Sequence, residues 1–301
     1  MVLLAVVAGV GWSNVLHEQR LLGWHKSMIE ASAAAPDQYR MLTPLLADTI
    51  FSFTAPDTVE QALLNLRHAY LAVHIVAFAV AGLFFVGFCR RWLSPSGSLL
   101  CCALLMAVAS VSNLRGQIQV ADPMNLMFVM IGLWAIQRRI TWLLVAAIML
   151  GAVNRESVLV LMGYFVLMEW PRPKRSVLLT AALLTIAWGV AYGAMRAGYG
   201  MRAYYVDVVM LEYNVAGFWR WAPPLLIMLP LLVAALKRPI KEWPGPLRRA
   251  TLAIPPYLLL HLIIARVEEV RLFLPLLPIL IPLAVLGVTG RPRGEQTPSP
   301  E

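Results

Sequence analysis

Residues 140–170 read ITWLLVAAIMLGAVNRESVLVLMGYFVLMEW, two apolar runs joined by a short polar step. The stretch is longer than a single membrane-spanning helix requires. In one continuous helix, Asn154, Arg155 and Glu156 would lie near the bilayer centre, where a charged side chain costs several kcal/mol. Two short helices with these residues at the turn avoid that cost. The stretch therefore predicts a pair of helices over 140–153 and 157–170, with the polar turn at one membrane face.

The composition of the whole chain extends this interpretation. Hydrophobic residues make up 60% of the 301 positions and charged residues only 14%, whereas soluble proteins are usually about half apolar and about a quarter charged. These values exclude a soluble enzyme, a disordered chain and a nucleic-acid-binding domain. We predict an all-α fold, a polytopic transmembrane helix bundle of about ten spans without a soluble domain. The expected spans are 1–16, 69–89, 97–113, 123–137, 140–153, 157–170, 176–195, 221–236, 250–265 and 272–288.

The distribution of basic residues predicts the topology. With both termini in the cytoplasm, 14 of the 25 Lys and Arg fall on the cytoplasmic side with four acids, against 11 basic and 12 acidic residues on the other side. This asymmetry follows the positive-inside rule, so the net charge of +9 indicates orientation and not a polyanionic partner. Residues 1–289 would form the transmembrane domain, with outward-facing loops at 17–67 and 196–220. Residues 290–301 would be a disordered cytoplasmic tail. Residues 1–16 could instead be a signal peptide, although no basic residue precedes the apolar run.

Several common catalytic signatures are absent from the chain. There is no Gly-Lys dipeptide, no His-Glu-x-x-His, no Cys-x-x-Cys and no Gly-x-Ser-x-Gly. The three cysteines, Cys89, Cys101 and Cys102, fit neither a disulfide framework nor a metal site. The sequence therefore argues against an ATP-driven pump, a zinc protease and a serine hydrolase.

Four segments expected on the outer side carry tight groups of polar residues beside apolar helices: 37–44 followed by Asp48, 115–123, 154–157 and 266–271. Solvated turns with internal salt bridges are the simplest account of such groups. Asp122 before Pro123 also suits the start of a helix, and the glutamates of the last group adjoin two arginines. We nevertheless predict that these segments line one cavity at the outer face. The candidate binding residues are Tyr39, Arg40, Asp122, Asn154, Arg155, Glu156, Glu268, Glu269 and Arg271.

This combination of side chains suits a ligand that carries phosphate. Arginine binds phosphate oxygens with two parallel hydrogen bonds. A carboxylate can take a proton from an incoming hydroxyl or hold a divalent cation. The aromatic residues between Tyr199 and Trp221 would lie at the membrane interface, or would stack on sugar rings.

Three motifs in order carry a family resemblance. They are Asp37-x-Tyr39-Arg40-x-Leu42-x-Pro44, then Ala121-Asp122-Pro123 opening a span, then Asn154-Arg155-Glu156-Ser157. Over roughly residues 36–171 this order resembles bacterial polytopic membrane glycosyltransferases of the GT-C superfamily, including its mannosyltransferase-like members.

The resemblance implies hexosyl or pentosyl transfer from a polyprenyl-phosphate-linked sugar at the outer face of the bacterial cytoplasmic membrane. Asp37 would act at the acceptor, with Asp48 as a substitute, and possible donor-phosphate ligands are Arg40, Arg155 and, by position only, Arg271. A divalent cation, Mg or Mn, could assist. Membrane lipids are the other expected partners, and nucleic acid is not expected.

Two other classes of function remain open from the sequence. Prolines that kink the C-terminal helices, with His261 inside a span, would suit a transporter or lipid flippase. A non-catalytic scaffold of the cell envelope would carry the same charges without using them in a reaction.

Overall fold

The computed structural model describes residues 18–112, 120–204 and 209–290, and in these ranges the chain is helical with no strand. The all-α prediction is confirmed. The expected first span at 1–16, residues 115–119 of the second polar group and the tail from 291 lie outside the described residues. An isolated bridge between Ala35 and Tyr204 joins two loop segments.

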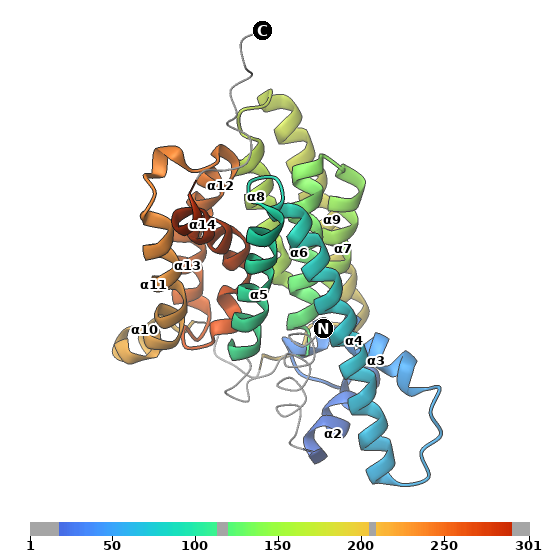
Figure 1. Cartoon of the computed structure of the whole chain (residues 1–301). Helices are drawn as coiled ribbons and strands as arrows, with labels where there is room; N and C mark the ends of the chain where they lie inside the picture. The colour runs from blue at the N-terminus through green and yellow to red at the C-terminus, as the bar shows by residue number, and fades with distance from the viewer. Residues whose placement is uncertain (1–17, 113–119, 205–208, 291–301) are drawn as a thin grey trace.

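Nine of the expected spans fall in the described ranges, and each corresponds to a helix in Figure 1. In chain order they are α4 (Val59–Cys89), α5 (Pro95–Ser112), α6 (Asp122–Arg138), α7 (Thr141–Asn154), α8 (Val160–Glu169), α9 (Lys174–Tyr199), α11 (Ala222–Leu236), α13 (Ile254–Ile264) and α14 (Leu277–Thr289). In the part of the chain that the structure describes, five helical segments are long and apolar enough to cross a membrane: Val59–Cys89, Lys174–Tyr199, Phe218–Leu236, Gly245–Ile264 and Val270–Thr289. These apolar helices indicate a membrane protein.

The polar step that interrupts residues 140–170 does break the helix. α7 ends at Asn154, Arg155 is extended, and a short 3-10 helix, η2 (Glu156–Leu159), leads into α8. This break confirms the predicted pair of short helices. It places the charged residues at the end of the bundle.

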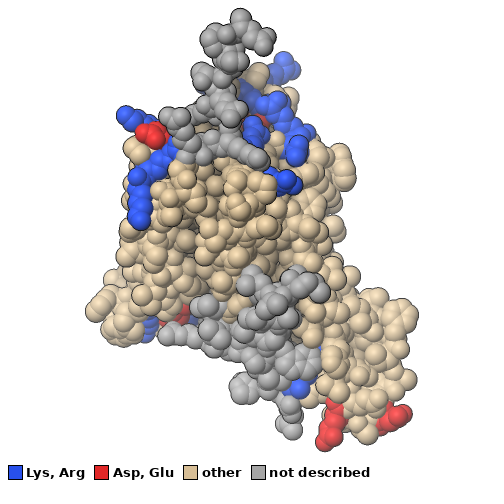
Figure 2. All heavy atoms as spheres, viewed as in Figure 1, with Lys and Arg blue, Asp and Glu red and all other residues tan. Residues whose placement is uncertain are grey.

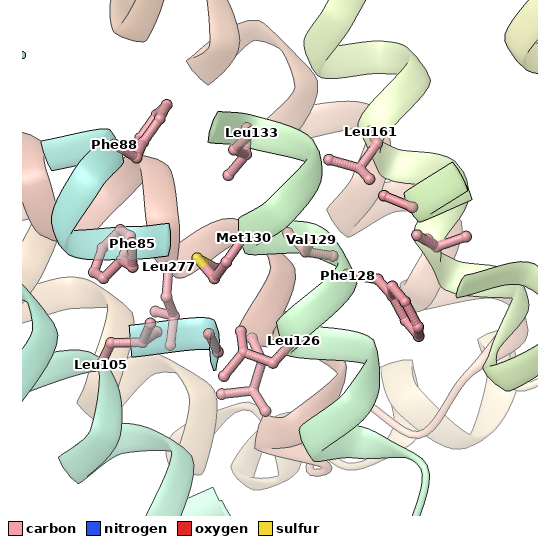
Figure 3. Close-up of a cluster of buried hydrophobic side chains, with 14 of the residues drawn as sticks. Phe85, Phe88, Leu105, Leu126, Phe128, Val129, Met130, Leu133, Leu161 and Leu277 are labelled. Carbon is pink, nitrogen blue, oxygen red and sulfur yellow. The ribbon is translucent and has the colours of Figure 1, made fainter. Parts of the chain in front are cut away.

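The core lies where α4, α5, α6 and α14 meet. Figure 3 shows Phe85, Leu105, Met130 and Leu277, one from each of these helices, pointing toward one another. Most of α14 is buried, whereas α11 and α13 present most of their surface outward. Gly287 lets α14 pack tightly on α11, because a Cβ at this position would overlap the carbonyl oxygen of Ala234.

Two expected loops contain helices. Residues 17–67 hold α2 (Glu18–Ile29), the 3-10 helix η1 (Asp37–Tyr39), α3 (Leu42–Phe51) and the first turns of α4, which begins ten residues before the expected span. Residues 196–220 hold the last turn of α9, α10 (Leu211–Ala216) and the start of the 3-10 helix η3 (Phe218–Trp221). These pieces are too short or too polar to be read as spans.

The prolines of the C-terminal third mostly begin helices and do not kink them. Pro223 and Pro224 open α11, Pro255 and Pro256 open α13, and Pro278 opens α14. The first turn of a helix has no use for the missing N–H, so proline fits there without strain. Only Pro230 and Pro282 lie inside described α-helices, which corrects the expectation of a uniformly kinked region.

The two ends of the bundle differ in charge. The basic end, at the top of Figures 1 and 2, holds the junctions α4–α5, α6–α7 and α8–α9, and the segment between α11 and α13 that includes η4 (Ile240–Glu242), α12 (Gly245–Ala250) and η5 (Thr251–Ala253). Figure 2 shows a band below it in which no Lys, Arg, Asp or Glu is visible on this face. The opposite end, called the site end below, holds the starts of α6 and α8 and the 3-10 helix η6 (Val270–Leu276).

Candidate functional site

Asp122 is the centre of a buried ion-pair group at the site end. It is the first residue of α6, where Pro123 fixes the helix start, and its side chain caps no backbone N–H. Arg155 Nη1 contacts Asp122 Oδ1, and Arg271 Nη1 of η6 lies 3.5 Å from Oδ2. The side chains of all three are no more than 6% exposed. The helix dipole at the start of α6 adds to the stabilisation of the carboxylate.

A further carboxylate completes the pairing of Arg271. Arg271 Nη2 donates a hydrogen bond to Glu269 Oε2 at 2.6 Å. Burial, with the charges of Arg40 and Arg271, lowers the pKa of Arg155 to about 9, which leaves its guanidinium protonated at neutral pH. The group is therefore a set of compensated charges and not an isolated buried ion, which would be far more costly.

Asn154 holds the segments of this site together. Its side chain is fully buried, accepts a hydrogen bond from Thr43 Oγ1 at 2.7 Å and donates to the carbonyl oxygen of Ala121 at 2.8 Å. It thus ties α3, the end of α7 and the start of α6 together. Both of these bonds are made to other parts of the chain, so the structure gives this predicted binding residue a positioning role.

Arg40 and Glu156 form the more open part of the site. Arg40 Nη2 donates to Glu156 Oε1 at 2.7 Å, and the Glu156 side chain is 43% exposed. Burial would raise the pKa of Glu156, but the charge and hydrogen bond of Arg40, with the charge of Arg155, lower it to about 2. Asp37 Oδ1 lies 4.0 Å from Arg40 Nη1, and the indole of Trp24 donates to Asp37 Oδ2 at 3.1 Å.

Seven predicted residues thus meet at the site end; they are Asp37, Arg40, Asp122, Arg155, Glu156, Glu269 and Arg271, called the outer cluster below. Within the described residues, only part of the outer cluster is open to solvent. The Asp122 part is packed, and the crevice that reaches it past Phe78 and Leu274 is too narrow for a water molecule. Solvent reaches Glu156 and, to a smaller extent, Asp37.

Two of the predicted residues bond elsewhere. Asp48 Oδ1 lies within hydrogen-bond distance of His25 Nε2, at 3.2 Å. The other ring nitrogen, His25 Nδ1, forms a hydrogen bond with the hydroxyl of Tyr70 at 2.9 Å. Burial lowers the pKa of His25 despite its bond to Asp48, which favours a neutral imidazole. Glu268 accepts from the Tyr213 hydroxyl at 2.8 Å and lies 3.8 Å from Arg220 Nε. Within the described ranges, the ion-pair and hydrogen-bond partners of these two carboxylates lie outside the outer cluster.

Sequence reasoning missed Arg196 on α9. Its guanidinium lies 4.4 Å from the ring centroid of Tyr39 and 4.8 Å from that of Tyr192, and it donates to the Tyr204 hydroxyl at 2.6 Å. Tyr39 itself donates to the carbonyl oxygen of Gly200. The four-residue spacing of Tyr192 and Arg196, which puts both on one helix face, was the signal available in the sequence.

The described carboxylates do not fit a metal ion. No group of three or more His, Cys, Asp or Glu gathers within the ranges that the structure covers. Asp122, Glu156 and Glu269 each face an arginine instead. We derive no step through a divalent cation.

Comparisons with known proteins add no relative. No family model, no curated protein and no solved structure matches the chain.

Proposed function

We propose that the chain is a membrane glycosyltransferase that moves a sugar from a polyprenyl-phosphate donor to an acceptor hydroxyl. The observation that carries the proposal is the outer cluster. Three arginines and four carboxylates from η1, α6, the α7–η2 turn and η6 meet at one end of an apolar helical bundle. Bringing so many charges together costs solvation free energy, and such clusters in membrane proteins mark functional sites more often than structural ones.

In the proposed reaction, the acceptor oxygen forms a bond to the anomeric carbon while the bond from that carbon to the lipid phosphate oxygen breaks. The electron pair of that bond leaves with the phosphate. The acceptor proton passes to the Asp37 carboxylate, which is partly exposed beside Arg40. Arg40 stabilises the charge that develops on the leaving phosphate, the usual electrostatic contribution to such a transfer.

The buried part of the outer cluster would act on this reaction indirectly. Asp122 fixes Arg155 and Arg271, and Asn154 fixes the turn that carries Arg155. Rigid neighbours keep the reacting groups at the distances that transfer requires.

We also propose that the chain crosses the bacterial cytoplasmic membrane ten times, with both termini in the cytoplasm and the outer cluster at the outer face. The basic junctions of the opposite end support this orientation, because Lys and Arg concentrate on the cytoplasmic side of membrane proteins.

The position of His261 weakens the transporter alternative. Coupled transport usually needs an ionisable group near the membrane midplane. His261 instead lies one turn before the end of α13, stacked on Tyr257 with 4.1 Å between ring centroids. It is therefore close to the site end of its helix.

The proposal is tested by transfer from a lipid-linked sugar to an acceptor with the purified chain in lipid nanodiscs. We expect Asp37→Asn to lower turnover by about 100-fold or more, because removing a general base typically has that effect. Asp57→Asn is the matched control, since Asp57 is an exposed acid in the same N-terminal region and lies outside the cluster. Equal turnover of the wild type and Asp37→Asn would reject the assignment.

A further inference from the structure

Arg196 differs from the other arginines of the site end in its partners. Arg40, Arg155 and Arg271 each face a carboxylate, whereas no carboxylate lies within ion-pair distance of Arg196 among the described residues. Its partners are the tyrosines Tyr39, Tyr192 and Tyr204. A partly buried cation without an anionic partner is favourable only if another anion can reach it or if aromatic rings compensate its charge.

The ring contacts leave part of the guanidinium available. Aromatic faces attract the cation but accept few of its five N–H donors. Nη2 donates to the Tyr204 hydroxyl, the Tyr192 hydroxyl is close enough to accept a second hydrogen bond, and the buried Nε has no hydrogen-bond partner among the described residues. The remaining N–H groups form a planar fork of the kind that binds phosphate oxygens in pairs.

Aromatic rings line the face of α9 beside Arg196. One turn before Tyr192, Trp188 stacks on it with centroids 4.6 Å apart and planes 12° apart. A Cβ added at Gly189 or Gly193 would meet nothing within 4 Å, so the helix surface beside these rings is open. Arg196 lies in the last turn of a helix that is apolar enough to span a membrane. An anion with an apolar tail could lie along this face with its head at Arg196.

The site adjoins the outer cluster. Tyr39, under Arg196, directly precedes Arg40, and the carboxylate of Glu156 is within electrostatic range of Tyr192. We propose that Arg196, framed by Tyr39, Tyr192 and Tyr204, binds the phosphate of a membrane-embedded ligand beside the reacting groups. This inference rests on the proposed function, because the phosphate held by Arg196 would be that of the sugar donor.

The test measures binding without transfer. The full chain is placed in nanodiscs of phosphatidylcholine, and equilibrium binding of radiolabelled farnesyl phosphate is measured with unlabelled farnesyl phosphate, farnesol or inorganic phosphate as competitor. We expect Arg196→Gln to weaken binding by about tenfold or more, the usual effect of losing a charge-assisted hydrogen bond. Arg196→Lys keeps the charge but loses the planar fork of donors, so its affinity for farnesyl phosphate should lie between those of the wild type and Arg196→Gln.

Arg138→Gln is the matched control. Arg138 is also a cation over an aromatic ring, 5.7 Å from the Trp134 centroid, but it is exposed at the basic end. Its substitution should leave binding unchanged. Equal affinity of wild type and Arg196→Gln, or an equal loss in Arg138→Gln, would overturn the proposal.

The competitors identify the source of the phosphate. Competition by farnesyl phosphate but not by inorganic phosphate or farnesol supports a lipid headgroup. Equal competition by inorganic phosphate supports the same anion site with a soluble ligand, and competition by farnesol as strong as by farnesyl phosphate overturns it. If binding depends on Arg196 but the chain transfers no sugar, the phosphate site stands and the glycosyltransferase proposal is rejected. If sugar transfer is the same with and without Arg196, the glycosyltransferase proposal stands and the phosphate site is rejected.

Discussion

The two ends of the bundle use their charges in different ways. At the basic end, Arg172 pairs with Glu169 three residues away and Arg238 with Glu242 four residues away, within single turns of the chain. At the site end, Arg40 reaches Glu156 across 116 residues, and Asp122 contacts arginines from two other segments. The local pairs need only the path of the chain just beyond a helix end, whereas the pairs of the site end require the whole bundle to be assembled. The basic end has one weaker contact between distant residues, Arg139 Nε at 4.0 Å from Glu169 Oε2.

This difference has an energetic consequence. Each local pair at the basic end keeps one partner partly exposed, Arg172 at 37% and Glu242 at 48%, although Glu169 and Arg238 are only 13% and 10% exposed. Such half-exposed pairs lose less solvation than a wholly buried pair and contribute little stability. Buried pairs are different: the pair as a whole contributes little net stability, but the loss of one partner leaves an uncompensated charge in a poorly solvated place. In the proposed topology, the charges at the basic end would orient the chain in the membrane, and those at the site end would serve the proposed reaction.

The largest expected effect is that of Asp122→Asn. The amide keeps the shape of the side chain but leaves Arg155 and Arg271 without their shared negative charge, so we expect the free energy of unfolding to fall by about 3–5 kcal/mol. Chemical denaturation of the purified chain in detergent measures it. Glu242→Gln, which removes the half-exposed carboxylate of a local pair, should cost less than about 1 kcal/mol. Equal losses in the two variants would show that the contrast between the ends has no energetic basis.

The helices of this bundle could be predicted from the sequence because hydropathy is a local property. The break after Asn154 was predictable for the same reason, since charged residues interrupt an apolar run there. Helix starts were less accurate: α4 begins at Val59, in a stretch whose Glu60 and Arg67 hide it from a hydropathy reading. Asp122 was expected to be a possible helix cap, but its oxygens face Arg155 and Arg271 instead.

The membership of the outer cluster was partly predictable, and its pairings were not. Polar residues in apolar surroundings are visible in a sequence, which is how Arg40, Arg155 and Arg271 were found. Asp37 and Asp48 look equivalent in the sequence, and only the packing of α2 on α3 gives Asp48 to His25. Arg196 was passed over because a basic residue in the last turn of a span is ordinarily explained by the interface alone.

A smaller effect is expected from the pH dependence of stability at the half-exposed pair. The pKa of Glu156 is lowered from its ordinary 4.5 to about 2 in the folded chain. The stabilisation is therefore complete above about pH 4.5 and is lost as the pH falls toward 2. Because the side chain is 43% exposed and screened by water, we expect no more than about 1 kcal/mol from it.

Denaturation at several pH values measures this contribution. Glu156→Gln should flatten the curve between about pH 4.5 and 2, whereas Glu30→Gln, at an exposed acid directly after α2, serves as the control and should keep the shape of the wild-type curve. If the curve for Glu156→Gln overlays that of the wild type throughout this range, the pair of Arg40 and Glu156 contributes nothing to the free energy of unfolding.

The smallest expected effect separates burial from position as the cause of the contrast. Lys26 and Glu30 pair at the site end, at 3.7 Å and four residues apart, but their side chains are 70% and 57% exposed. If burial decides, this exposed pair should give about 0.5 kcal/mol or less in a double-mutant cycle with alanine. Its coupling should not exceed that of Arg238 and Glu242 at the basic end, where the Arg238 side chain is only 10% exposed. A coupling clearly above about 1 kcal/mol for Lys26 and Glu30 alone would assign the contrast to the site end itself. Comparable small values would leave burial among distant segments as the property that sets Asp122, Arg155 and Arg271 apart.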